Sequence, residues 1–466
     1  MLPLLMAVAA ARPTDGDGMW TFDASDTVAV HDAPSGLVRV WYSTGGPNVA
    51  LLDDVDGDGV PDLVADVAIT SEAVLDNLDA LGLPRPLPDE GLGGDDRLDV
   101  YLVDFGGDAD GNWATEGCDG NACYGYFQME NDFEGYGYSD LHTAVQVLTS
   151  HELFHGVQAA HGGSEAVWFL EGTATWAEVA FDPESRDFLR FCDAYLDDTG
   201  RSLYEPPGGP VPPFAYGTAL WWWFLTNRYG TEMMADLLVS MGESADDEAL
   251  VAAMVALEAS HGGDGADDFT DFSRWNLATG FKAGRVEGYP FAASLGGISA
   301  EADGAAIVDE SRFYPLAATY YRLEWAGGPL TFHTSDAGEA LRLSLHGEDE
   351  VGDVSDALLE FGATGAATEL GDFEAGTYWL VVTNPEWAET STKLTVCLGD
   401  TAAVAACGST VEDSGGSGDR GDDSAGETEE GETDQPACGC AAPTGAGGSV
   451  LAAAVAMLVA RHRRRE

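Results

Sequence analysis

The sequence predicts an α+β protein that ends in a β-sandwich, and three patterns support this prediction. Short runs of alternating apolar residues predict strands at Arg97–Val103 and Cys123–Met129. Helical periodicity follows from residue 140 to about 280. Residues 300–400 then return to short alternating runs separated by Gly and Asp turns. We therefore expect a large α+β domain in residues 12–290 and a β-sandwich domain in residues 300–400.

The individual elements follow from the same periodicities. Helices are predicted at 66–81, 141–160, 164–181, 214–229, 231–241 and 246–259, and several of them end at Gly. In the second domain, strands are predicted at Tyr320–Trp325 and Leu341–Leu345, and Gly371–Asn384 looks like the late hairpin of a β-sandwich.

The charge balance excludes one class of partner. Eighty-one acidic residues against twenty basic ones give a formal net charge of -61, which repels the phosphates of nucleic acids. Because 45% of the residues are hydrophobic, the chain has enough apolar surface to form cores. Residues 411–435 differ, because this Ser/Gly/Asp/Glu/Thr stretch predicts an acidic, disordered linker.

Both the N-terminus and the cysteines favour export to the cell surface or the medium. Residues 1–11 form an apolar run that ends in small residues, which predicts a signal peptide, although a buried first strand is the alternative. Cys118 with Cys123, and Cys397 with Cys407, are spaced to close short disulfide loops. Cys192 lies in an apolar segment and is expected to be a buried thiol.

The strongest chemical signal is the segment His151-Glu152-Leu153-Phe154-His155, an HExxH motif within a predicted helix. Residues four apart share one helix face, so His151 and His155 can direct two imidazoles at one metal ion. Glu152 then lies beside them, within reach of a water bound to the metal. The alternative is an amphipathic helix with two solvated histidines.

A catalytic zinc needs a third protein ligand, and three residues are candidates. His161 stands ten residues after His151, but a helix that continues through Gln158 turns His161 away from the shared face. Glu171 lies on the next predicted helix. Glu178, two turns further on, either supports a ligand histidine or is solvated.

The segment Trp168-Phe169-Leu170-Glu171-Gly172-Thr173-Ala174 resembles the gluzincin metallopeptidases, in which a second helix carries W-L-x-E-G-x-A after HExxH. The resemblance implies a zincin-like domain, a Zn2+ cofactor and Glu171 as the third ligand. Fifteen residues separate His155 from Glu171, slightly fewer than in the aminopeptidase and thermolysin-like branches, so the connecting loop must be tight.

The resemblance further implies a zinc-dependent endopeptidase that acts on a protein or peptide substrate. Glu152 is its expected general base. Tyr216 is the expected donor to the oxyanion, with packing beside Trp221–Trp223 as the alternative. Gly125–Met129 is either an edge strand for extended substrate or a buried core strand.

A second candidate metal site precedes the motif. The segment 54–62 places carboxylates at Asp54, Asp56, Asp58 and Asp62, and its glycines permit a tight turn. Such a cluster of oxygen ligands suits Ca2+. This site would be structural, and an ordinary acidic turn is the alternative.

Residues 436–466 combine Cys438-Gly439-Cys440, an apolar stretch through Ala460 and the Arg-rich segment 461–465. This arrangement resembles the MYXO-CTERM sorting tag, which implies transient membrane anchoring and a C-terminal sorting protease as a partner. A plain tail anchor is the alternative.

Two other functions stay open at this stage. One is a noncatalytic calcium-binding surface or adhesion protein with a degenerate metal site. The other is a zinc hydrolase for a non-protein substrate, because the same metal chemistry allows both kinds of hydrolysis.

Overall fold

The computed structural model describes residues 11–16, 18–162, 166–208, 211–242, 247–283, 287–338, 340–363, 365–387 and 391–412. The predicted linker after residue 412, the C-terminal tag and all but the last residue of the predicted signal peptide lie outside this part of the chain. Among the described residues, none of the helices combines the length and the hydropathy needed to cross a membrane.

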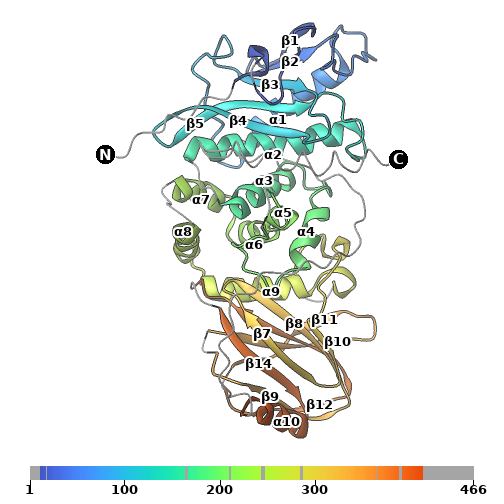
Figure 1. Cartoon of the computed structure of the whole chain (residues 1–466), viewed down its shortest axis with the longest axis vertical. Helices are drawn as coiled ribbons and strands as arrows, with labels where there is room; N and C mark the ends of the chain where they lie inside the picture. The colour runs from blue at the N-terminus through green and yellow to red at the C-terminus, as the bar shows by residue number, and fades with distance from the viewer. Residues whose placement is uncertain are drawn as a thin grey trace. The chain divides into compact units, whose positions relative to one another are not determined.

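The prediction of an α+β fold is confirmed, because a mixed sheet with helices is followed by a β-rich region of two sheets (Figure 1). The described residues form two compact units. The first contains the described residues up to Cys192 and those of Pro206–Leu257, and the second contains Asp193–Glu205 and the described residues from Glu258 on.

The second compact unit takes up the chain again at Glu258, whereas the sequence predicts a first domain that extends to residue 290. Helix α9 (Gly265–Leu277) lies in the second unit, where it packs against strand β13 (Gly376–Asn384). The Tyr320 hydroxyl also donates to the carbonyl of Ser273 in α9, at 2.7 Å. Helical periodicity alone did not reveal this attachment, since it says nothing about the partner of a helix.

A mixed sheet forms the frame of the first unit. Its strands are β1 (Val28–Asp32), β2 (Val38–Ser43), β3 (Leu98–Val103), β4 (Gly111–Asp119) and β5 (Ala122–Glu130), in the spatial order β1-β2-β3-β5-β4. The two inner pairs, β2–β3 and β3–β5, are parallel, whereas the outer pairs β1–β2 and β4–β5 are antiparallel. Strand β4 therefore lies at one edge of the sheet.

Both faces of this sheet are covered. Helices α1 (Asp62–Ala80) and α2 (Leu141–His161) contact each other, and they pack on β2 and on β4 and β5, respectively (Figure 1). Tyr101 and Val103 belong to a second cluster with Phe22. Because side chains alternate along a strand, this cluster covers the other face. There the Arg12 guanidinium binds Asp89, Asp99 and Glu116 and ties down the start of the described chain.

Further helices complete the first unit on the far side of α2. They are α3 (Val167–Phe181), α4 (Leu189–Leu196), α5 (Pro213–Gly217), α6 (Ala219–Tyr229), α7 (Glu232–Gly242) and α8 (Asp247–Ser260). Helices α4 and α8 both continue into the second unit. The helix predicted over 214–229 is interrupted at Thr218. The Thr218 hydroxyl interacts at 2.7 Å with the carbonyls of Ala215 and Trp168, which fixes this break against α3.

The second unit contains two sheets. Their strands are β6 (Ala302–Gly304), β7 (Ile307–Phe313), β8 (Ala317–Trp325), β9 (Gly328–Thr334), β10 (Arg342–Glu348), β11 (Val354–Gly362), β12 (Thr368–Phe373), β13 and β14 (Thr392–Gly399). One sheet has the order β11-β10-β13-β8-β6 and the other β12-β9-β14-β7. Helix α10 (Thr401–Glu412) follows β14.

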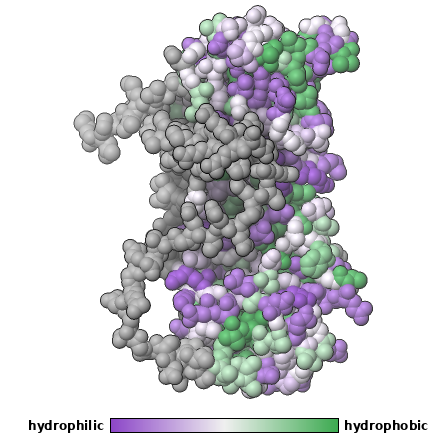
Figure 2. All heavy atoms as spheres, turned by 45° about the vertical axis from the view of Figure 1, so that its right-hand side comes forward, coloured by the Kyte–Doolittle hydropathy of each residue, from purple (hydrophilic) through white to green (hydrophobic). Residues whose placement is uncertain are grey.

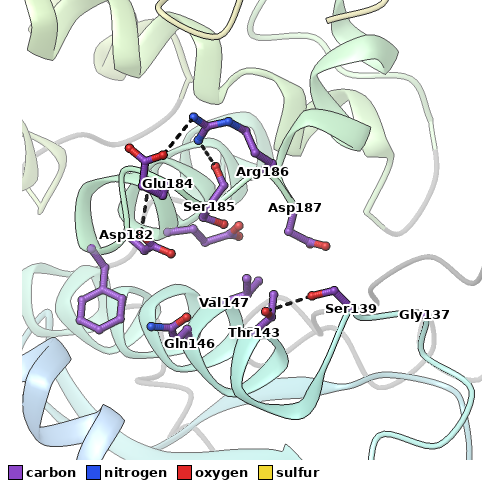
Figure 3. Close-up of a pocket in the computed structure, with 12 residues that line it drawn as sticks. Gly137, Ser139, Thr143, Gln146, Val147, Asp182, Glu184, Ser185, Arg186 and Asp187 are labelled. Atoms are coloured by element: carbon purple, nitrogen blue, oxygen red, sulfur yellow. Dashed lines mark hydrogen bonds and ion pairs between the residues drawn. The ribbon is translucent and has the colours of Figure 1, made fainter. Parts of the chain in front are cut away.

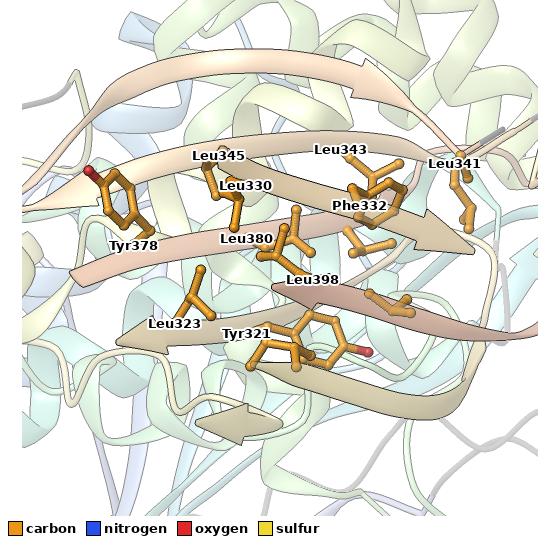
Figure 4. Close-up of a cluster of buried hydrophobic side chains, with 14 of the residues drawn as sticks. Tyr321, Leu323, Leu330, Phe332, Leu341, Leu343, Leu345, Tyr378, Leu380 and Leu398 are labelled. Atoms are coloured by element: carbon orange, nitrogen blue, oxygen red, sulfur yellow. The ribbon is translucent and has the colours of Figure 1, made fainter. Parts of the chain in front are cut away.

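Side chains from both sheets meet in one apolar core (Figure 4). Leu343 and Leu380 come from the first sheet, and Leu330 and Leu398 from the second. This core corrects the predicted hairpin at Gly371–Asn384: β12 pairs with β9, whereas β13 pairs with β10 and β8. The turn between β12 and β13 therefore crosses from one sheet to the other, which lets both strands contribute side chains to the shared core.

Both predicted disulfides are present. Cys118–Cys123 joins the ends of β4 and β5, and Cys397–Cys407 fastens α10 to β14. Cys192 is buried, as predicted. Two disulfides indicate an oxidising compartment and are consistent with an extracellular protein.

The visible surface mixes polar and apolar side chains. On the face in Figure 2, hydrophilic side chains are interspersed with hydrophobic ones. Exposed large hydrophobic residues such as Val55, Phe281 and Val351 come from separate parts of the sequence.

Candidate metal centre

Helix α2 carries the HExxH motif through the interior of the first unit. It begins where the Asp140 side chain accepts a hydrogen bond from the backbone N–H of Thr143, at 2.9 Å, and it ends at Gly162, whose φ of 97° suits glycine. Between these ends α2 packs against strands β4 and β5 and against helix α3. Every residue from Ala144 to Ala159 except Gln146 is buried, so the polar side chains of the motif have little access to water.

The structure brings His151, His155 and Glu171 together. The Glu171 Oε2 atom lies 3.3 Å from Nε2 of His151 and 3.6 Å from Nε2 of His155. One ligand atom from each residue lies within 4.8 Å of the other two, and all three residues are buried. This buried group is a possible metal site.

The hydrogen bonds on the far side of each ring fix the histidine tautomers. The Nδ1 atom of His151 donates to Glu178 Oε1 at 2.8 Å, and Nδ1 of His155 donates to Gln158 Oε1 at 2.7 Å. With Nδ1 protonated, each neutral ring presents the lone pair of Nε2 to the Glu171 carboxylate. A lone pair facing a carboxylate is unfavourable unless a proton or a metal ion lies between them.

Electrostatics point to the same need for a cation. Burial alone would raise the pKa of Glu171, but His155 and His151 lower it to about 2. Burial would likewise lower the pKa of both histidines, and their carboxylate neighbours raise it instead. A buried carboxylate with no exposed side-chain surface requires a compensating positive charge, which a metal ion would supply.

Two atoms at the centre remain unsatisfied. Among the described residues, Nε2 of His155 and Oε1 of Glu171 make no hydrogen bond, although both are buried. Such atoms are uncommon in protein interiors and mark places where an ion or water belongs. Two imidazole nitrogens and one carboxylate oxygen form a donor set typical of a catalytic zinc site. The residues therefore fit a zinc ion.

Glu178 is buried and hydrogen-bonded to His151, so the solvated alternative for this residue is wrong. Burial raises its pKa to about 7, against the opposing effect of His151.

Sequence reasoning missed the role of Gln158, which entered only as a residue of the helix that turns His161 away from the shared face. Its side-chain N–H groups donate to the Leu170 carbonyl at 2.9 Å and to the Thr173 hydroxyl at 2.7 Å. Gln158 thus connects His155 on α2 to helix α3, which carries Glu171. Its position three residues after His155, on the same side of the helix, was the available signal.

Gly172 permits the close packing that places Glu171. A Cβ atom at this position would lie 2.1 Å from the Thr218 hydroxyl and 2.7 Å from Nε1 of Trp222. Only glycine therefore allows α3 to approach the α5–α6 break closely enough. In the Glu171-Gly172 pair, Glu171 supplies the carboxylate and Gly172 allows the close packing that positions it.

Glu152 points toward the sheet edge. A Cβ atom at Gly111, the first residue of β4, would lie 3.0 Å from Glu152 Oε1, so this glycine leaves room for the carboxylate. Gly125–Met129 was considered as an edge strand, but β5 pairs with strands on both sides. The core-strand alternative is correct, and β4 is the edge strand that lies beside Glu152.

Tyr216 lies next to the centre. Its ring centroid is 5.8 Å from that of His151, and it stacks on Phe191 at 4.7 Å. The side chain is buried. Both predicted roles, packing and donation to a reacting oxygen, are compatible with this position.

His161 and the acidic loop lie outside the buried group. His161 is at the end of α2, half-buried, and burial lowers its pKa. Asp54, Asp56 and Asp58 form a separate group of ligand atoms within 4.8 Å, and all three are exposed. Asp62 is not part of that group, and its carboxylate accepts from the backbone N–H of Val55.

No protein-family model matches the sequence, and no curated protein matches it. We therefore infer the function from the geometry of the centre and from the motif resemblance around Glu171.

Proposed function

We propose that this chain is a zinc-dependent endopeptidase with a zincin-like first unit, in which His151, His155 and Glu171 hold the metal ion. The buried group of two Nε2 atoms and one carboxylate, with both Nδ1 atoms held by other side chains, carries this proposal. The gluzincin-like segment around Glu171 supports it, because the residue that the resemblance selects as a ligand lies beside both histidines.

Zinc, when bound here, would act as a Lewis acid that polarises the scissile carbonyl and acidifies a water molecule. Glu152 is the general base that removes the proton of the attacking water and later delivers it to the leaving amine. Its buried carboxylate, close to Gly111, has the position that this role requires, beside the ligands on the same helix. Glu178 and Gln158 keep the ligand rings oriented throughout the reaction.

Strand β4 offers a surface for the substrate. An extended peptide that pairs with this edge strand would pass Glu152 and would be held by main-chain hydrogen bonds. Tyr216, stacked between Phe191 and the His151 ring, is the candidate donor to the oxygen of the tetrahedral intermediate.

The other parts of the chain fit an exported enzyme. We interpret the two sheets of the second unit as a β-sandwich that accompanies the peptidase. The exposed Asp54, Asp56 and Asp58 would bind Ca2+ in a structural role. Export through the predicted signal peptide, and surface attachment through the MYXO-CTERM-like tag by a sorting protease, complete the proposal.

A noncatalytic calcium-binding adhesion protein is the second candidate, and the exposed Asp group is the observation that favours it. An adhesion function does not explain why both histidine rings of the buried centre are oriented by hydrogen bonds at Nδ1. A hydrolase for a non-protein substrate would use the same metal chemistry as the peptidase and would differ only in the substrate that it binds.

The direct test is to load the full chain with zinc and to measure both metal content and cleavage of an unfolded protein. The proposal predicts about one zinc per chain and cleavage that chelation abolishes and added zinc restores. Zinc binding without cleavage of any protein would favour the non-protein hydrolase. Failure to bind zinc would leave the adhesion protein as the better account.

A further inference from the structure

A cavity of about 460 Å³ lies in the first unit (Figure 3), and its lining includes Glu178, whose carboxylate binds His151 of the candidate metal centre. It is bounded on one side by the first half of α2, at Thr143, Gln146 and Val147, and on the other by the end of α3 and the loop 182–187. Its volume lies in the range of sites that bind small molecules or side chains.

The charges around this cavity are mostly negative. Glu178, Asp182, Glu184 and Asp187 contribute four carboxylates, and Arg186 is the one basic residue in the lining. Asp182 and Asp187 point into the space between the loop and α2 in Figure 3. The Glu184 side chain is 91% exposed and stands at the rim.

The basic residues close to the loop are already engaged. Arg186 donates to the carbonyls of Pro183 and Ser185 at 2.9 and 2.6 Å. Arg190, which does not line the cavity, pairs with Asp187 at 2.9 Å. Asp182 and Glu178 have no ion pair with an Arg or Lys side chain among the described residues.

An oxygen atom of Glu178 provides an independent sign of a missing partner. Oε1 of Glu178 binds His151, but Oε2 is buried and makes no hydrogen bond among the described residues. The Glu178 side chain is only 3% exposed, and the residue lines the cavity. A buried carboxylate oxygen without a donor is costly, and a cationic group in the cavity would supply that donor.

The spacing of these carboxylates favours an organic cation over a metal ion. In the described part of the chain, two groups of ligand atoms lie close enough to hold a metal ion, and neither group contains a carboxylate that lines this cavity. Apolar surface from Val147 and Phe181 is also present, which suits the methylene stem of a long basic side chain.

We infer that this cavity is a specificity pocket that binds a Lys or Arg side chain of the substrate, next to the scissile bond. The inference rests on the proposed peptidase function. The Glu178 carboxylate then faces two partners, with Oε1 on the ligand His151 and Oε2 toward the substrate cation. The pocket would select basic side chains although the chain as a whole carries a net charge of -61.

The test separates binding from cleavage. The zinc-loaded full chain with Glu152→Gln is titrated calorimetrically with four peptides that differ at one position, which is Arg, Lys, Leu or Glu. We expect the Arg and Lys peptides to bind about tenfold or more tightly than the Leu peptide, and the Glu peptide to bind most weakly. Equal affinities for Arg and Leu, or no binding of any peptide, would overturn the inference.

Two further variants locate the preference. Asp182→Asn keeps an oxygen that can accept from the backbone N–H of Glu184, and Glu184→Gln changes a side chain that is 91% exposed, so both variants should fold. Each should reduce the preference for Arg over Leu, Asp182→Asn more strongly. Asp76→Asn, which removes an exposed carboxylate outside the cavity, is the matched control and should leave the preference unchanged.

Cleavage by the wild-type chain distinguishes this inference from the proposed function. A preference for basic peptides in binding, without cleavage of any of the four, would refute the peptidase and retain the pocket. Equal cleavage of all four peptides would retain the peptidase and refute the pocket.

Discussion

Two groups of possible metal ligands in the first unit are built in opposite ways. At the buried centre, His151 and His155 are held by Glu178 and Gln158, two side chains that are not among the possible ligands. In the exposed loop, the carboxylates are held by the backbone of the loop itself, since Asp54 accepts from the N–H groups of Gly57 and Gly59 at 2.8 and 3.0 Å.

This difference has an energetic consequence. The buried group is preorganised, and its Glu171 carboxylate lacks a counter-charge until an ion or protons arrive. The exposed carboxylates are hydrated and already satisfied, so an ion there must compete with water and with the loop N–H groups. We therefore expect a metal ion to bind tightly at the buried centre and weakly at the loop. Variants of either group test this difference.

The largest effect is expected from removing the third ligand. Glu171→Ala should lower zinc affinity by more than 100-fold, beyond the roughly 10- to 100-fold loss typical of residues that only support a ligand. His161→Ala is the matched control, because His161 lies outside the buried group. Metal content after dialysis against a chelator measures both, and a larger loss in the His161 variant would reverse the assignment.

Removing the support of a ligand should have a smaller effect. Gln158→Ala and Glu178→Ala should each lower zinc affinity by about 10- to 100-fold, because the corresponding ring loses the partner of its Nδ1–H. A competition titration with a zinc-binding dye measures the change. Gln146→Ala changes a residue of the same helix that makes no hydrogen bond to either ring among the described residues, so it should retain wild-type affinity. An equal loss there would indicate general damage to α2.

The packing that positions Glu171 can be tested without touching a ligand. Gly172→Ala should destabilise the protein by about 1–3 kcal/mol, because the added methyl group collides with Thr218 and Trp222. Chemical denaturation measures this change in the free energy of unfolding. Gly208→Ala is the control, since a Cβ atom there meets nothing within 4 Å. Equal stability of both variants would refute the packing argument for Gly172.

The smallest effect is expected at the exposed loop. With a dissociation constant of about 10⁻⁴–10⁻³ M, as in extracellular modules, calcium at about 10 mM should stabilise the protein by about 1–3 kcal/mol. Asp56→Asn should abolish this gain and leave zinc content unchanged. Thermal unfolding with and without calcium measures it, and identical curves for the wild type in both conditions would refute a calcium site.

Local sequence patterns predicted the features that depend on residues close together in the chain. The HExxH helix, the disulfide partners and the strand periods follow from spacing along the chain, and the structure contains them. The placement of Glu171 beside the two histidines agrees with the motif resemblance.

Long-range packing produced the features that the sequence did not reveal. The role of Gln158 depends on how α3 lies against α2, which fixes the positions of Leu170 and Thr173. The edge position of β4 depends on strand order, and the crossing between β12 and β13 depends on which sheet each strand joins. Periodicity gives the faces of an element but not its partner.

The most direct test of the central claim compares Glu152→Gln with the wild type in the full chain. If Glu152 is the general base and not a ligand, the variant should retain about one zinc per chain and lose cleavage activity by about 10²- to 10⁴-fold. A variant that binds zinc and cleaves unfolded protein at the wild-type rate would contradict the account.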